Sequence, residues 1–328
     1  MSYENTQLFV DGNWRDSTDG VTIEVVNPAT GQVIGQVAAA ALTDLEHAVE
    51  AAERGFAVWS CMSAYDRSRI IRSAAQLLRD RSEAIARTLT TDEGKPLAES
   101  RLEVASCADL LDWFAEEGRR TYGRMIPSRA VEVHQLAIRE PVGVAVGFTP
   151  WNFPMSQIVR KLGPAVASGC AIVIKGPEEA PGAPAALFRC FSDAGFPAGV
   201  VNLLFGVPAR MSEFLVPHPI VSKVSFTGSI RVGKHLAAMA GGHMKRVTME
   251  LGGHAPVIVT DDADVESATT LLVTSKFRNA GQVCIAPTRF MVQDGIHDKF
   301  VDLFTTKARG CRFPARTDPG FPLRTDPA

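Results

Sequence analysis

Residues 142–148 read Val142-Gly143-Val144-Ala145-Val146-Gly147-Phe148, a short apolar run typical of a buried β-strand. Comparable runs follow, separated by segments long enough for helices, at 171–175, 200–205, 223–226 and 255–260. Strands that alternate with helices in this way form a parallel sheet with crossover helices. The pattern therefore predicts an α/β fold with a Rossmann-like nucleotide-binding domain, although the fingerprint Gly-x-Gly-x-x-Gly is absent.

The region before these strands changes from strand to helical patterning. The first forty residues predict short strands at 8–10 and 23–26, with Asp11-Gly12 as a hairpin turn. Apolar residues at helical spacing then predict three helices, with Thr43 to Glu46 supplying the N-cap of the first. These helices are expected at 43–59, from Asp66 through Ile85, and at 102–114.

The region after residue 260 predicts a helix that starts at Asp264, a strand at 288–292 and a helix at 296–305. From Gly310 to Ala328 the chain is rich in Pro and Arg and follows neither periodicity. We expect this last segment to be disordered.

Composition excludes several classes of protein. A length of 328 residues suggests more than one domain, and a formal net charge of −2 offers no basic surface for nucleic acid. The apolar stretches are too short to cross a bilayer, and the first residues show no targeting signal, so a cytoplasmic location is expected. Six widely separated cysteines are interpreted as reduced thiols, with no metal site.

Two glycine-bearing segments contain the residues needed for covalent chemistry on a carbonyl. They are Met249-Glu250-Leu251-Gly252-Gly253 and Phe277-Arg278-Asn279-Ala280-Gly281-Gln282-Val283-Cys284. A thiolate can attack a carbonyl carbon, and a carboxylate can then activate water. An isolated Cys in an apolar neighbourhood is more often inert, so either segment alone is weak evidence.

With Thr149-Pro150-Trp151-Asn152-Phe153-Pro154 and Phe226-Thr227-Gly228-Ser229 in the same order, the chain resembles the NAD(P)-dependent aldehyde dehydrogenase family. The resemblance covers residues 5 to 308 and implies two domains. Residues 1–254 correspond to the nucleotide-binding domain, with helical and bridging segments at 43–140 and a βαβ core at 141–254. Residues 255–308 correspond to the start of an incomplete catalytic α/β domain, and residues 309–328 to a tail foreign to the family.

The resemblance also assigns catalytic roles. Cys284 matches the nucleophile, and Asn152 matches the amide that, with the backbone N–H of Cys284, stabilises the oxyanion. Glu250 matches the general base, and its apolar neighbours at the end of a predicted strand, 246–251, are unusual for a surface loop. Alternatively, Asn152 is an ordinary turn residue and Glu250 a solvated or capping acid.

Cofactor contacts follow in the same way, with the remaining matching residues being Thr149, Pro150, Trp151, Gly228, Ser229 and Leu251. Lys175 and Glu178 match the pair that holds the adenosine ribose. An acid there repels a 2′-phosphate, so the resemblance implies NAD, with NADP possible. Gly228 and Ser229 open a helix whose N-terminus can receive a pyrophosphate, although Ser229 can also be a plain N-cap.

Two arginines narrow the expected substrate. Arg160 and Arg278 stand at offsets that resemble the succinate-semialdehyde dehydrogenase branch of the family. Two guanidinium groups in one pocket would bind the distal carboxylate of a semialdehyde. Alternatively, Arg160, next to Lys161, is a solvent-facing helix charge.

The resemblance leaves other functions open. Full-length members continue beyond residue 308 and form homo-oligomers through a segment absent here, so we expect a truncated, aggregation-prone chain of low activity.

One alternative is a catalytically impaired fragment that keeps only the nucleotide-binding fold. Another is an unrelated Cys hydrolase or acyltransferase, which would need a His to activate the thiol. Nothing in the sequence identifies His254 as that partner.

Overall fold

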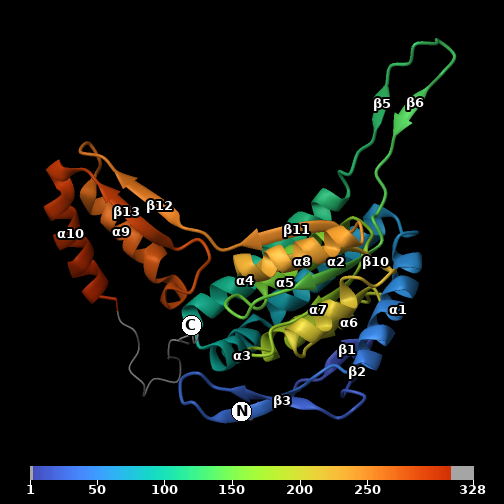
Figure 1. Ribbon diagram of the computed structural model, residues 1–328, viewed down its shortest axis with the longest axis horizontal. Coiled ribbons are helices and arrows are strands. Elements are labelled where there is room, and N and C mark those ends of the chain that lie inside the picture. The colour runs from blue at the N-terminus through green and yellow to red at the C-terminus, as the bar shows by residue number, and fades with distance from the viewer. Residues whose placement is uncertain (1–2, 312–328) are drawn as a thin grey trace.

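The computed structural model describes residues 3–311 and places a seven-stranded sheet at the centre of the larger lobe (Figure 1). Five parallel strands form its core in the order β11 (Arg246–Leu251), β10 (Val221–Gly228), β7 (Val144–Phe148), β8 (Ala171–Lys175) and β9 (Val201–Leu204). The N-terminal strands β1 (Leu8–Val10) and β2 (Asn13–Arg15) extend the sheet in antiparallel pairing. The parallel α/β sheet predicted from the sequence is confirmed.

The connections between these strands make the sheet doubly wound. Helices α5 (Ser156–Ala167) and α6 (Gly182–Asp193) link β7 to β8 and β8 to β9, whereas α7 (Pro208–Leu215) and α8 (Ile230–Gly242) lead back to β10 and on to β11. The strand order therefore reverses between β7 and β10. In such sheets, ligands bind in the crevice outside the carboxyl ends of the strands at that reversal.

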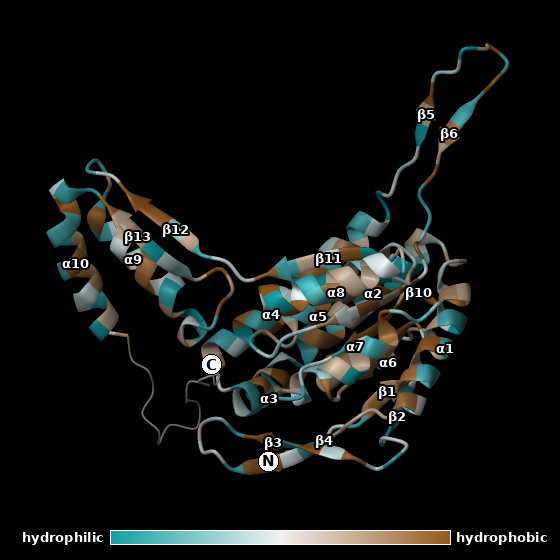
Figure 2. Ribbon diagram, viewed as in Figure 1, coloured by the Kyte–Doolittle hydropathy of each residue, from teal (hydrophilic) through white to brown (hydrophobic). Residues whose placement is uncertain are grey.

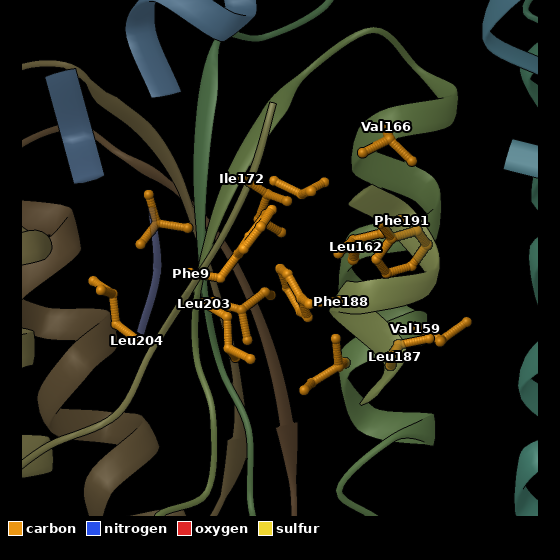
Figure 3. Close-up of a cluster of buried hydrophobic side chains, with 14 of the residues drawn as sticks. Phe9, Val159, Leu162, Val166, Ile172, Leu187, Phe188, Phe191, Leu203 and Leu204 are labelled. Atoms are coloured by element: carbon orange, nitrogen blue, oxygen red, sulfur yellow. The ribbon is translucent and has the colours of Figure 1, made fainter. Parts of the chain in front are cut away.

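The core is continuous because the central strands are buried on both faces. Every residue of β7, β8 and β9 is buried. Figure 3 shows side chains of α5 and α6, among them Leu162, Phe188 and Phe191, facing Phe9 and Ile172 of the sheet. Phe9 and Phe188 pack edge to face with ring centroids 5.9 Å apart.

The helices of the N-terminal half differ from the prediction in their bounds. They are α1 (Leu42–Trp59), α2 (Ala64–Asp80), α3 (Ser82–Glu93) and α4 (Leu97–Gly118). The N-cap of α1 is Ala41 and not Thr43, because Asp44 in the first turn accepts a hydrogen bond from the Ala41 N–H. The run predicted from Asp66 through Ile85 is broken after Asp80, so Ile85 belongs to a separate helix.

Two hairpins lie outside the central sheet. Strands β3 (Thr22–Val26) and β4 (Val33–Ala38) form the first. The second, β5 (Arg124–Ile126) with β6 (Gln135–Ala137), projects far from the body and was not predicted (Figure 1). Apolar residues lie along this projection (Figure 2), and its exposed members include Met125, Val131 and Leu136.

A smaller lobe follows β11. Strands β12 (Ala255–Val259) and β13 (Pro287–Val292) pair in parallel and are covered by α9 (Val265–Phe277) and α10 (Asp294–Arg309). The prediction that strand 255–260 belongs to the main parallel sheet is therefore wrong. Helix α9 begins after the N-cap Asp264, as predicted. Helix α10 includes Arg309, the first residue of the predicted foreign tail, whereas residues 312–328 lie outside the described part.

The smaller lobe has a core of its own. Val259, Val265, Leu272 and Phe300 are buried together, and Phe290, Phe300 and Phe304 form an aromatic cluster. Its sheet remains open to solvent on the other face, where Ile258 is 72% exposed. Among residues 3–311, no helix is long and apolar enough to span a membrane.

Candidate active site

A cavity of about 690 Å³ between the two lobes contains the thiol and the carboxylate predicted to act together. Glu250 reaches it from strand β11, and Cys284 from the turn that follows α9. Both residues are exposed, and Glu250 lies in strand β11, which has the bounds predicted for it, and not in a surface loop. Thr248 and Glu250 of β11 both line this cavity, because residues two apart on a strand point to the same face of the sheet.

The turn before Cys284 has an unusual backbone. A short 3₁₀ segment, η1 (Arg278–Gly281), contains Asn279 at φ 47° and Ala280 at φ 54°. Left-handed residues other than glycine cost about 1 kcal/mol each, so the surrounding contacts must hold them. The backbone N–H of buried Asn279 donates to Glu99 Oε2 at 2.8 Å, which anchors the turn to α4.

Asn152 lies beside this turn. Its side-chain Nδ2 donates to the carbonyl oxygen of Gln282 at 2.8 Å. A side-chain amide nitrogen carries two hydrogens, so one remains for another acceptor. Asn152 does not line the cavity itself, but Phe153, the next residue, does. The structure thus places the predicted amide against the segment that bears Cys284, two residues before the thiol.

The two arginines predicted to bind a carboxylate line the same cavity as Cys284. Arg160 comes from α5, and Arg278 comes from η1. The guanidinium of Arg278 lies over the Phe153 ring, 5.3 Å from its centroid. Neither arginine forms a salt bridge with another described residue, and both side chains are exposed. Two positive charges are therefore available to an anionic group in the cavity.

Lys161 is a cavity residue that sequence reasoning treated only as a neighbour of Arg160. It is buried, and its Nζ donates to Thr227 Oγ1 at 2.5 Å. Burial lowers the pKa of Lys161 to about 8, although the carboxylate of Glu250 acts in the opposite direction. Gln157 lines the same cavity and lies four residues before Lys161 on helix α5. Residues at this spacing share one face of a helix, so the sequence contained a signal that could have identified both as cavity residues.

A second cavity, of about 910 Å³, opens at the carboxyl ends of β7 and β10, where the strand order reverses. Six of the predicted cofactor residues line it: Thr149, Pro150, Trp151, Lys175, Glu178 and Ser229. Lys175 and Glu178 form an ion pair. Ser229 is the N-cap of α8, and its Oγ accepts the N–H of Val232 at 3.4 Å.

The other two predicted cofactor residues do not line this second cavity. Gly228 ends strand β10 beneath it, and the side chain of Leu251 packs closely against Gly233 of α8. Thr227 lines both cavities, so the two spaces meet at this residue. Within residues 3–311, no cluster of His, Cys, Asp and Glu could hold a metal ion.

The fold and the site define an α/β protein with a nucleotide-type cleft beside an exposed thiol. The chain belongs to the aldehyde dehydrogenase family, whose family model matches residues 14–323. Members of this family are oxidoreductases that use NAD or NADP.

The names of individual relatives indicate different substrates. The chain is 46% identical over 302 residues to a 4-(hydroxymethyl)benzenesulfonate dehydrogenase of Comamonas testosteroni, covering 92% of this chain and 63% of that protein. It is 40% identical over 296 residues to the NADP(+) succinate-semialdehyde dehydrogenase of Escherichia coli K12, covering 90% and 61%. The chain thus spans less than two-thirds of the length of these relatives.

A solved structure agrees with the fold. The crystal structure of succinate-semialdehyde dehydrogenase from Burkholderia pseudomallei superposes with a TM-score of 0.93 at 38% identity, covering 96% of this chain and 65% of that one. The predicted aldehyde dehydrogenase fold is therefore confirmed over the described lobes.

Proposed function

We propose that this chain serves the NAD(P)-dependent oxidation of an aldehyde that carries a second, anionic group, as in succinate semialdehyde. The observation that carries the proposal is one cavity lined by Cys284, Glu250, Arg160 and Arg278. A thiol, a base and two cations facing the same space match a small substrate with an aldehyde at one end and a negative charge at the other.

The chemistry follows from these residues. Sγ of Cys284 adds to the aldehyde carbon as a thiolate and gives a thiohemiacetal. The free hydrogen on Asn152 Nδ2 and the backbone N–H of Cys284 stabilise the oxyanion during this step. Oxidation of the thiohemiacetal leaves a thioester on Cys284. Glu250 then takes a proton from a water molecule, which hydrolyses the thioester and releases the acid.

The second cavity suits a dinucleotide by its volume, by its place at the strand reversal and by the N-terminus of α8 at its wall. The nicotinamide ring supplies the hydride acceptor when the cofactor is bound. Lys175 and Glu178 would hold the adenosine ribose, and Ser229 would lie beside the pyrophosphate. Glu178 would repel a 2′-phosphate, which favours NAD over NADP, although Lys175 partly neutralises this acid.

Sulfonate-bearing aldehydes are a second candidate class. The benzenesulfonate relative is more similar to this chain than the succinate-semialdehyde relative, at 46% against 40% identity. Arginine binds a sulfonate and a carboxylate through the same planar fork of donors. A cavity of about 690 Å³ has room for either class of aldehyde, so the rates with the two substrates decide between them.

The test is NADH production with succinate semialdehyde, with 4-formylbenzenesulfonate and with butanal, which lacks a charge. The Cys284→Ala protein is the control. Equal rates with the charged and the neutral aldehydes would reject the two-arginine site. No turnover, combined with NAD binding by calorimetry, would instead support a fragment that keeps only the nucleotide-binding fold. The cytoplasmic location stays a prediction, as does the homo-oligomeric assembly of full-length members.

A further inference from the structure

Lys95 is a buried cation to which the proposed chemistry assigns no role. It lies in the short loop between α3 and α4, and its side chain is completely buried. Its Nζ donates to Glu103 Oε2 at 2.6 Å and to the backbone oxygen of Asn152 at 2.9 Å. It also lies 4.1 Å from the centroid of the Phe153 ring. A buried ammonium needs such partners, so its position is tightly determined.

The backbone oxygen of Asn152 accepts a second hydrogen bond, from the other side of the site. Asn279 Nδ2 donates to it at 2.9 Å and also to Glu93 Oε1 at 3.1 Å. Asn279 is one of the two left-handed residues in the turn before Cys284. A single carbonyl oxygen thus joins Lys95, fixed among the N-terminal helices, to the turn that carries the thiol.

Glu103 connects Lys95 to the start of α5 through further hydrogen bonds. Its Oε1 accepts the backbone N–H groups of Met155 at 3.1 Å and Ser156 at 3.0 Å, while its Oε2 binds Lys95. The Lys95–Glu103 pair therefore holds the segment 152–156 at both ends. The side-chain amide of Asn152 contacts Gln282, two residues before Cys284. A small movement of segment 152–156 therefore changes the position of this amide relative to the thiol.

We propose that Lys95 is a positioning residue that acts through the Asn152 carbonyl and keeps the Asn152 amide and the Cys284 turn in one geometry. The inference rests on the proposed function for its chemical consequence. Its structural part, that one cation orders two distant segments, is tested separately from turnover.

The structural part is tested by hydrogen–deuterium exchange on the Lys95→Met variant. Exchange is expected to rise about tenfold or more in both segments, 150–156 and 278–284, because their shared anchor is lost. Lys299→Met, which removes an exposed lysine from α10, is the matched control and should leave both segments unchanged. Unchanged exchange in either segment of Lys95→Met would overturn the inference.

The chemical part uses thiohemiacetal formation, which needs no cofactor. Succinate semialdehyde should protect Cys284 from iodoacetamide, with exposed Cys61 as the reference thiol in the same sample. Lys95→Met should weaken this protection about a hundredfold, the effect expected from a small misplacement of a reacting group. In the Asn152→Ala background, Lys95→Met should weaken the protection by a much smaller factor, because only its effect on the Cys284 turn through the backbone oxygen of residue 152 remains. Additive losses in the double variant would contradict action through Asn152.

A second variant covers the case in which Lys95→Met does not fold. Lys95→Met combined with Glu103→Gln removes both charges of the Lys95–Glu103 pair and keeps an oxygen for the N–H groups of Met155 and Ser156. Buried Glu93, whose Oε1 lies 3.8 Å from Lys95 Nζ, is the carboxylate that remains beside it, and Asn279 Nδ2 still donates to it. The same exchange and protection results are expected from it. If the unsubstituted chain shows no protection by any aldehyde, the proposed function fails, and the exchange result alone decides the positioning role.

Discussion

Nδ2 of Asn152 donates a 2.8 Å hydrogen bond to the carbonyl oxygen of Gln282, although 130 positions separate the two residues in the chain. The bond crosses from the larger lobe to the turn that presents Cys284. It fixes the direction of the Asn152 amide plane while leaving one N–H hydrogen free. This relationship supports the oxyanion role proposed for Asn152.

Asn152→Ala is expected to lower kcat for aldehyde oxidation by about 10²–10³-fold, the usual effect of losing one oxyanion donor. KM should change little, because the donor matters most once negative charge develops on the oxygen. Steady-state kinetics with succinate semialdehyde measures both constants. A larger effect on KM than on kcat would contradict the oxyanion role.

Glu250→Gln should separate the two halves of the reaction. Without a base to activate water, the thioester on Cys284 should accumulate after about one equivalent of NADH has formed per site. Rapid mixing should therefore show a burst followed by a very slow phase. Cys284→Ala should give no burst. An unreduced steady-state rate in Glu250→Gln would remove this residue from the mechanism.

Arg278→Met should raise KM for succinate semialdehyde by about 10–100-fold, because a charge-assisted hydrogen bond to the distal carboxylate is lost. The kinetic constants for butanal should not change, since butanal has no anionic group. The comparison of the two substrates is the measurement. A parallel rise in KM for both would indicate general damage to the cavity instead.

Lys161 predicts an unusual dependence of stability on pH. Burial lowers its pKa from 10.5 to about 8, so the unfolded chain binds more protons between these values and folding stability rises with pH across that window. Below pH 8 the protonated lysine costs roughly 3 kcal/mol. Lys161→Met should remove this part of the slope in urea unfolding, whereas Lys299→Met should keep it. Identical slopes in all three proteins would show that Lys161 titrates normally.

Gly199→Ala should destabilise the larger lobe strongly. Gly199 has φ +79°, and a Cβ there would lie 2.0 Å from the backbone oxygen of Ala51 in α1. The expected loss is about 3 kcal/mol or more in the free energy of unfolding. Gly195→Ala is the control, because Gly195 has φ +86° but open space around it, so only about 1 kcal/mol of backbone strain applies. Equal losses in urea unfolding would exclude the predicted clash.

The sequence predicted the main sheet well because its central strands are buried on both faces. Strand 171–175 was predicted with its observed bounds, since burial demands an unbroken apolar run such as Ala171-Ile172-Val173-Ile174. The projecting hairpin was missed for the opposite reason. Residues 124–137 face solvent on both sides, so β5 and β6 leave no alternation of apolar and polar residues.

The candidate site was predicted only in part. Motif matching found Cys284, Glu250 and both arginines, and the structure brings all four to one cavity. Lys95 was missed because local sequence gives no signal for a buried lysine. Its partners, Glu103 and the Asn152 carbonyl, come from distant segments, and only tertiary packing brings them together.

The division into two lobes has a consequence for Cys284. The thiol follows helix α9 of the smaller lobe, whereas Asn152, Lys161 and Glu250 belong to the larger one. Between them the chain passes through only Gly252, Gly253 and His254. Cys284 therefore lies beside these three residues only when the two lobes are in contact. Selective labelling of this one sulfur would report how firmly the halves of the molecule are joined, without any assay of turnover.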